Sequence, residues 1–233
     1  MWYKIKKIYQ WTNQVRPSGW APDASRTLLY LPLESDATDM SWNSRTTSAN
    51  SVTYTTVGWV KSAHVWSGWW ISVWGSFLSQ SISKRTISCL VYWTSQYNSH
   101  RRAMCNTFWS TSNMGLLGKE STSYIQWWTW WVGISTESPS NAYPANQRFH
   151  IVWTWEDWAN NNKLYINWEV VATANGTSIP RWYSGGSWYY VMRTDTNDES
   201  LDGNMREMIW ENVVWSAEDV SNYYNRIKAK LWF

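Results

Sequence analysis

The feature that most constrains the fold of this chain is a long series of short β-type runs with turn residues between them. From Thr27 onward the runs are rich in Val, Ile, Thr, Tyr and Trp. They span residues 27–33, 51–56, 61–66, 71–74, 85–93, 101–108, 114–118, 121–126, 148–155, 163–167, 169–174, 187–193 and 202–214. Because no helical pattern lies between them, the sequence predicts an all-β antiparallel sandwich or barrel.

A single helix is predicted near the end of the chain, over residues 216–229. Ser216 suits the N-cap, and Glu218 and Asp219 suit the positive end of the helix dipole. Apolar residues then recur at a spacing of three or four, at Val220, Tyr223, Tyr224 and Ile227. We expect this apolar face to pack on the sandwich.

The residues before the sandwich predict a separate short hairpin. A strand-like run, a turn and a return strand are stopped by Pro17, which cannot donate to a strand ladder. The predicted organisation is therefore an N-terminal β-hairpin over residues 1–17, a linker over 18–26 and a β-sandwich domain with its C-terminal helix over 27–233.

Charge and composition exclude several partners. The 20 Lys and Arg less the 17 Asp and Glu leave a formal charge of +3, with basic clusters only at the two ends, so nucleic acid is not expected as a partner. No run of about 18 apolar residues is present, so no membrane span is expected, and the first nine residues lack the apolar stretch of a signal peptide. Cys89 and Cys105 cannot make a disulfide framework, and we expect both in the core.

Tryptophan is abnormally frequent, at 24 of 233 residues against 11 glycines. Asn167-Trp168 lies between two strand-like runs, where a two-residue hairpin favours Asn-Gly because both central residues need positive φ. A Trp in that conformation would be strained by about 1–2 kcal/mol. Other tryptophans also lie in segments expected to be turns or loops, at 41–44, 58–59, 67–70, 127–131 and 157–158.

These positions suggest the hypothesis that many of the tryptophans are encoded by UGA in an organism or phage that reads UGA as glycine. Exposed indoles in so many loops would promote aggregation. Trp93 and Trp153, inside strand-like runs, are expected to be true tryptophans. The alternative is a genuinely Trp-rich protein, such as a sugar binder with many stacking rings.

With Trp read as Gly where turns require it, the chain resembles the laminin-G-like jelly rolls of the concanavalin A-like lectin/glucanase superfamily. The segments that carry the resemblance are 29–44, 63–73, 85–91, 149–171 and 201–220. The likeness covers roughly residues 27–225 and implies a two-sheet jelly roll. The superfamily includes lectins, adhesion modules, glycosidases and passive spacers, so it leaves the function open. Residues 7–15 resemble N-terminal pieces of phage tail and baseplate proteins.

A hydrolase would need carboxylates on one face of a strand, about 5–5.5 Å apart in a retaining enzyme. Glu34, Asp36 and Asp39 mimic the glucanase spacing, but they follow the first strand-like run, so turn chemistry explains the two aspartates better. The histidines are far apart at 64, 100 and 150, and we expect each to be structural or exposed.

One acidic segment offers a calcium site. Asp195, Asp198 and Asp202 concentrate hard oxygen ligands in one expected loop, and many relatives in the superfamily bind calcium at a sandwich edge. The spacing is not that of an EF-hand, and a solvated acidic loop is the alternative.

Sugar binding needs aromatic faces together with amide, carboxylate or guanidinium groups on a shallow surface. Alternation along the predicted strands selects Tyr92, Tyr124, Gln126, Tyr189 and Arg193 as the candidate ligand-binding residues. The expectation is a non-catalytic glycan-binding or adhesion module on a phage virion or cell surface, attached to other proteins through the N-terminal hairpin. A glycoside hydrolase on the same fold and a structural virion decoration are the alternatives.

Overall fold

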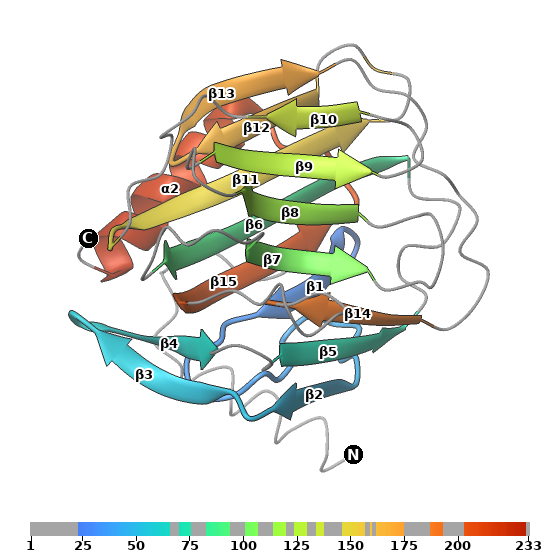
Figure 1. Cartoon of the computed structure of the whole chain (residues 1–233). Helices are drawn as coiled ribbons and strands as arrows, with labels where there is room; N and C mark the ends of the chain where they lie inside the picture. The colour runs from blue at the N-terminus through green and yellow to red at the C-terminus, as the bar shows by residue number, and fades with distance from the viewer. Residues whose placement is uncertain are drawn as a thin grey trace.

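The computed structural model describes residues 23–65, 70–75, 83–93, 101–106, 114–119, 124–129, 134–137, 146–156, 159, 162–174, 187–192 and 203–231. The predicted N-terminal hairpin and most of the predicted linker lie outside this part of the chain. Within it, two antiparallel sheets lie face to face and one helix covers the far side of the larger sheet (Figure 1). An all-β, two-sheet antiparallel sandwich with a C-terminal helix is thereby confirmed.

The larger sheet, sheet A, has eight strands in the order β13-β12-β11-β6-β15-β4-β3, with β1 also paired to β15. Its strands are β1 (Thr27–Leu31), β3 (Thr53–Val57), β4 (Val60–Val65), β6 (Lys84–Trp93), β11 (Arg148–Glu156), β12 (Asn162–Ile166), β13 (Glu169–Ala174) and β15 (Gly203–Glu211). Sheet B has the order β10-β9-β8-β7-β14-β5-β2. Its strands are β2 (Thr47–Asn50), β5 (Trp70–Gly75), β7 (Arg101–Asn106), β8 (Met114–Lys119), β9 (Tyr124–Thr129), β10 (Ile134–Glu137) and β14 (Ser187–Val191).

The main core lies between the sheets and follows the period of two in the sequence. On β6, Ile87, Cys89 and Val91 face this core with residues of sheet B such as Val73 and Val191. Cys89 is a buried free thiol, as predicted, and burial raises its pKa to about 12. It therefore acts as a small apolar residue at neutral pH.

A second apolar cluster joins the opposite face of sheet A to the helix α2 (Ala217–Leu231). Val220, Tyr223, Ile227 and Leu231 of the helix pack with sheet residues that include Leu90 and Val152. The predicted N-cap is confirmed, because Ser216 Oγ accepts from Asp219 N at 3.1 Å and Asp219 Oδ2 accepts from Ser216 N at 2.9 Å. The helix ends two residues beyond the predicted boundary.

The tryptophans divide between core and surface. Trp153 is buried, as are Trp155 and Trp210, whereas Trp42 is 67% exposed and Trp59 90% exposed. The expectation that residues 127–131 form a turn is wrong in part, because Trp127, Trp128 and Thr129 belong to β9 and pair with both β8 and β10.

The expectation of strain at Trp168 is also wrong. In the turn between β12 and β13, Asn167 has a φ of 61°, while Trp168 is not among the residues with positive φ. The turn therefore needs a left-handed residue only at its first position, where Asn is tolerated. Trp168 packs on Tyr224 of α2, with ring centroids 4.8 Å apart.

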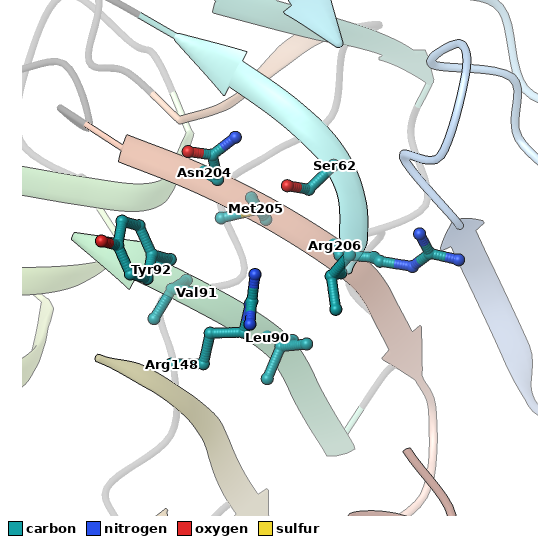
Figure 2. A pocket seen from close by; sticks show the side chains of 9 residues that line it. Ser62, Leu90, Val91, Tyr92, Arg148, Asn204, Met205 and Arg206 are labelled. Carbon is teal, nitrogen blue, oxygen red and sulfur yellow. The ribbon is translucent and has the colours of Figure 1, made fainter. Parts of the chain in front are cut away.

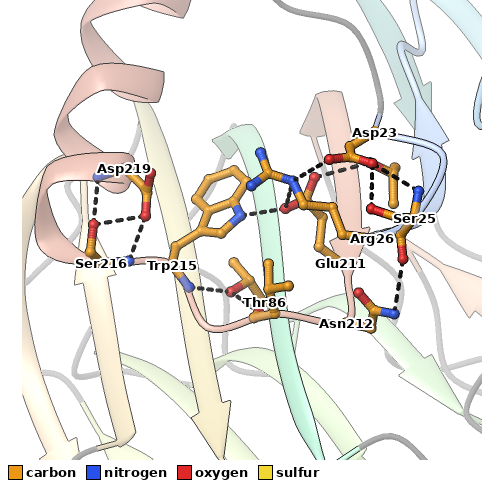
Figure 3. A network of polar contacts seen from close by, with 11 residues as sticks. Asp23, Ser25, Arg26, Thr86, Glu211, Asn212, Trp215, Ser216 and Asp219 are labelled. Atoms are coloured by element: carbon orange, nitrogen blue, oxygen red, sulfur yellow. Dashed lines mark hydrogen bonds and ion pairs between the residues drawn. The ribbon is translucent and has the colours of Figure 1, made fainter.

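Glu211, which is fully buried at the end of β15, connects the start of the sandwich to the start of the helix (Figure 3). Its Oε2 accepts from Trp215 Nε1 at 2.6 Å and lies 3.4 Å from Arg26 Nε. Its Oε1 accepts from Thr27 Oγ1 at 3.0 Å. One carboxylate thus fixes β1, β15 and the segment that leads into α2.

We predict that Glu211→Ala lowers the free energy of unfolding by at least about 2 kcal/mol, because two buried donors lose their acceptor at about 1–3 kcal/mol each. Chemical denaturation monitored by tryptophan fluorescence measures the effect. Glu169→Ala, at an exposed carboxylate of β13, serves as the control, with a change within about 0.5 kcal/mol. Equal stability of the two variants would contradict the role given to Glu211.

Candidate functional site

A shallow pocket opens on the outer face of sheet A, next to the part that α2 covers. Val60 and Leu90 line it and also belong to the cluster under α2, so the pocket begins where the cover of the helix ends. It is a slight hollow of about 10 Å³, room for about one water molecule, and it is open to solvent. Figure 2 shows the polar side chains of Ser62, Arg148 and Asn204 around this space, with Tyr92 at its edge.

The register of sheet A places four of the polar and aromatic residues in one row across the strands. Arg148 of β11 is opposite Tyr92 of β6, Tyr92 is opposite Asn204 of β15, and Asn204 is opposite His64 of β4. Directly opposed residues on antiparallel strands lie on the same face, about 4.5–5.5 Å apart at Cβ. Arg148, Tyr92, Asn204 and His64 therefore form a continuous polar row on the outer face.

Neighbouring side chains orient Asn204. Its Nδ2 donates to Thr55 Oγ1 at 2.8 Å, and its Oδ1 lies 3.3 Å from His64 Nδ1. These contacts use part of the hydrogen-bonding capacity of the amide and leave one N–H and one lone pair. Asn204 is buried and is thus held in place, with part of its hydrogen-bonding capacity not used by these two contacts.

Arg148 is half-buried and has no ion pair within the described part of the chain. Its Nη2 is buried without a hydrogen-bond partner, and its guanidinium carbon lies 5.8 Å from the centre of the Tyr92 ring. Burial lowers the pKa of Arg148 from its ordinary value; the phenol group of Tyr92 opposes this shift electrostatically, and the nearby charge of Arg206 adds to it. An arginine stays protonated at neutral pH, so the pocket contains an uncompensated cation.

The hairpin between β3 and β4 reaches the guanidinium of Arg148. Gly58, at the first position of this two-residue turn, has a φ of +58°, which is unfavourable for residues with a side chain. A Cβ built on Gly58 would lie 3.5 Å from Arg148 Nη1 and 3.6 Å from Nη2. The hairpin backbone and the Tyr92 ring together limit where the guanidinium can move.

Arg206, also in the pocket wall, differs from Arg148 because its charge is compensated. It is buried, donates through Nη1 to the Lys61 carbonyl and lies 3.1 Å through Nη2 from Glu34 Oε2. A bulge in β15 places Glu207 beside it with a φ of 55°. Glu207 accepts from Tyr30 Oη at 2.8 Å and from Lys230 Nζ at 3.0 Å, so this cluster is a structural network.

The three carboxylates with glucanase-like spacing have structural roles. Asp39 is buried and accepts hydrogen bonds from the backbone N of Tyr30, Ser41 and Arg45 at 2.8–3.1 Å, as well as from the Ser41 hydroxyl. Asp36 Oδ1 accepts from Thr38 N at 2.8 Å. The interpretation of both aspartates as turn residues is therefore confirmed.

A Ser–His pair that resembles part of a catalytic triad is closed to solvent. Ser88 Oγ lies 2.6 Å from His150 Nε2, and His150 Nδ1 lies 3.3 Å from the Asn167 carbonyl. The carbonyl can only accept, so Nδ1 donates and Nε2 accepts from the serine. Both residues are fully buried beneath Tyr223 and Tyr224 of α2, so no substrate reaches them. The pair has a structural role, which agrees with the expectation for His150.

The predicted ligand-binding residues are not brought together. Tyr92 lies in the polar row of sheet A. On sheet B, Tyr189 belongs to β14 and is paired with Val73 of β5. Tyr124 and Gln126 belong to β9, which is three strands from β14 in that sheet. Arg193 and the predicted calcium ligands Asp195, Asp198 and Asp202 lie outside the described residues.

Sequence reasoning missed Arg148, Asn204 and His64. Arg148 lies two residues before the buried His150 at the start of a predicted strand, so alternation places both on the same face of the sheet. This pattern does not indicate that Arg148 belongs to a binding site. Among the residues that the structure describes, no group of three or more His, Cys, Asp or Glu is placed to hold a metal ion. In the same part of the chain, no helix combines the length and apolar character needed to cross a bilayer.

No protein-family model and no curated protein matches the sequence, but solved structures match the fold. Domain 4 of AbnA, a GH43 extracellular arabinanase from Geobacillus stearothermophilus in complex with arabinotriose, superposes with a TM-score of 0.67 at 13% identity over 86% of this chain and 98% of that chain. The ligand-binding domain of botulinum neurotoxin serotype D in complex with N-acetylneuraminic acid gives a TM-score of 0.64 at 15% identity over 85% of this chain and 50% of that chain.

A mutant of Trypanosoma rangeli sialidase displaying trans-sialidase activity gives a TM-score of 0.64 at 11% identity, over 97% of this chain and 38% of that chain. The chain thus spans half of the toxin domain and less than half of the sialidase. At these identities the likeness establishes the fold alone. The chain shares with these structures the fold of a two-sheet antiparallel β-sandwich.

We predict that His150 makes stability depend on pH. Burial lowers its pKa to about 3, whereas the unfolded residue titrates near 6.5, so below that pH the unfolded state binds a proton that the folded state excludes. Stability is expected to fall as the pH drops from about 6.5 toward 3, by about 1.4 kcal/mol per pH unit.

Urea unfolding of wild type, His150→Gln and His64→Gln at about pH 7 and pH 4.5 measures this dependence. His150→Gln should be less stable at pH 7 but should lose less stability than wild type on acidification. His64→Gln, at a half-exposed position, should keep the wild-type dependence. An unchanged pH dependence in His150→Gln would show that His150 is not the group responsible.

Proposed function

We propose that this protein is a non-catalytic carbohydrate-binding module and that the pocket around Arg148 and Tyr92 is a glycan-binding site. The observation that carries the proposal is the polar row, in which a half-buried, unpaired guanidinium, a half-buried aromatic ring and a buried, oriented amide are neighbours on one face of a lectin-like sandwich. Two proteins with this fold were solved with arabinotriose and N-acetylneuraminic acid, which supports a glycan as the ligand.

The chemistry of the row suits a sugar. A sugar ring presents C–H groups on its faces, which pack on an aromatic ring such as Tyr92, and hydroxyls at its edge, which bind amide and guanidinium groups. Asn204 is already oriented by Thr55 and His64, so binding would cost little side-chain entropy there.

The other predicted binding residues extend the proposal to a second surface. Tyr124 and Gln126 are two residues apart on β9 of sheet B, so a chain of sugars would find an aromatic and an amide residue on one strand. Tyr189 of β14, Arg193 and a calcium ion at Asp195, Asp198 and Asp202 remain part of the proposal.

We predict that Tyr92→Ala weakens glycan binding at least about tenfold, equivalent to about 1.4 kcal/mol, because the sugar loses the ring on which it packs. Tyr92→Phe, which keeps the ring, should bind within a few fold of wild type. A glycan array identifies the ligand, and isothermal titration calorimetry measures the affinities.

Trp42→Ala is the matched control, because it removes an exposed aromatic ring from a turn outside the pocket. If Tyr92→Ala binds like wild type while Tyr124→Ala does not, the site lies on sheet B and not at the pocket. If no glycan binds at all, the proposed function is wrong.

The proposal includes display on the surface of a phage virion or a cell, with the N-terminal hairpin of residues 1–17 attaching the module to other proteins. It rests on the resemblance of that hairpin to tail and baseplate pieces. Neighbouring genes for tail proteins, and co-purification of the chain with virions, would test it.

The hypothesis of recoded UGA is retained for the exposed tryptophans. Trp59 and Trp42 place large apolar rings in solvent, in turns where glycine would be at no disadvantage. We predict that the intact mass of the protein from its natural source is lower than that of the printed sequence, with glycine at residues 42 and 59 and tryptophan at residues 93 and 153. UGG codons at 42 and 59 would rule the hypothesis out for these positions.

A further inference from the structure

We infer that the Arg148 pocket selects an anionic sugar group, a carboxylate or a sulfate ester, over neutral sugars. This inference rests on the proposed function, since it names the class of glycan for the same site. It follows from the charges around the pocket, from the geometry of the guanidinium and from the neutral groups beside it.

The charges around the pocket leave one cation without a counter-ion. The carboxylates closest to the pocket wall are engaged elsewhere, Glu34 with Arg206 and Glu207 with Tyr30, Arg206 and Lys230. No carboxylate in the described part of the chain pairs with Arg148. Arg206 is paired with Glu34, so Arg148 is the cation of this pocket to which a bound anion would supply a counter-ion.

The geometry of Arg148 suits an anion with two oxygens. A guanidinium presents a planar fork of N–H donors that matches a carboxylate or a sulfate edge, and such charge-assisted bonds are about twice as strong as neutral ones. Nη2 is already removed from water and lacks a partner, so part of the cost of desolvating the guanidinium is present in the free protein and is not added on binding. Gly58 and Tyr92 on either side restrict the fork.

Neutral groups next to the fork can bind the rest of the sugar. Ser62 is 4% exposed and lines the pocket. Its hydroxyl and the free positions of Asn204 can donate to and accept from sugar hydroxyls. An inorganic anion would use only the guanidinium, whereas an acidic sugar uses all three groups.

The decisive experiment compares matched polysaccharides by calorimetry at low salt. Polygalacturonate carries carboxylates, its methyl ester lacks their charge, and heparin carries sulfates as well as carboxylates. Wild type is expected to bind at least one acidic polymer at least tenfold more tightly than the ester, and the affinity should fall as NaCl is raised. The ratio between the two acidic polymers shows which anion the pocket prefers.

Variants assign that preference to Arg148. Arg148→Gln is expected to remove the preference for the acidic polymers, whereas Lys163→Gln, which removes a cation from β12 outside the pocket, should leave it unchanged. Arg148→Lys, which keeps the charge without the planar fork, should lose several-fold affinity. This variant also provides the test if thermal unfolding shows that Arg148→Gln does not fold.

Two results would overturn the inference. If wild type binds the ester as tightly as the acid and Tyr92→Ala abolishes both, the site binds neutral glycans, so the proposed function stands and the inference fails. If Arg148→Gln and Arg148→Lys fold and keep the acidic preference, the anion is bound elsewhere. If no polymer binds and the glycan array is also negative, both the proposed function and the inference fail.

Discussion

The pairing of β6 with β11 and β15 is the constraint on which the rest of the molecule depends. β6 lies at the centre of sheet A and is paired along nearly its whole length to both neighbours. Because side chains alternate across a strand, this register sends Ile87, Cys89 and Val91 into the core and Leu90 and Tyr92 to the outer face. A shift by one residue would exchange the two faces, which would bury the polar row and expose the core.

The helix α2 then divides the outer face of sheet A into a covered and an open part. Its apolar residues cover the region around Leu90 and Val152, and the Glu207 and Glu211 networks fix the sheet to the two ends of the helix. The pocket lies beside this cover, at the end of β6 where Tyr92 remains half-buried. The same packing closes the Ser88–His150 pair under the helix and leaves the Arg148 pocket accessible, so the position of α2 decides which polar group can meet a ligand.

Local patterns in the sequence were enough to predict most of the strands, the helix and its N-cap, because alternation, apolar spacing and capping residues act within a few residues. They missed the short strands β2 and β10 and the end of β9. They were also enough for the turn roles of Asp36 and Asp39. They could not predict the row of Arg148, Tyr92, Asn204 and His64, since these residues are far apart in the chain and meet only through the order of strands in sheet A. The error at Trp168 had another cause: the turn requires positive φ at Asn167 alone, so the residue after it tolerates a side chain.

A comparison of the buried charges explains why Arg148 stands apart. Glu211 binds Trp215, Thr27 and Arg26, and Arg206 binds Lys61 and Glu34, so each has partners that offset its desolvation. Arg148 loses water around Nη2 without gaining a partner from the described residues, which costs stability. Packing alone does not require a guanidinium there, because its long side chain lies next to a Tyr ring and a hairpin backbone that an uncharged side chain could also contact. An anionic ligand would supply the partner that Arg148 lacks and so offset this desolvation cost. Because the cost is already present in the free protein, the new ion pair would favour anionic over neutral ligands.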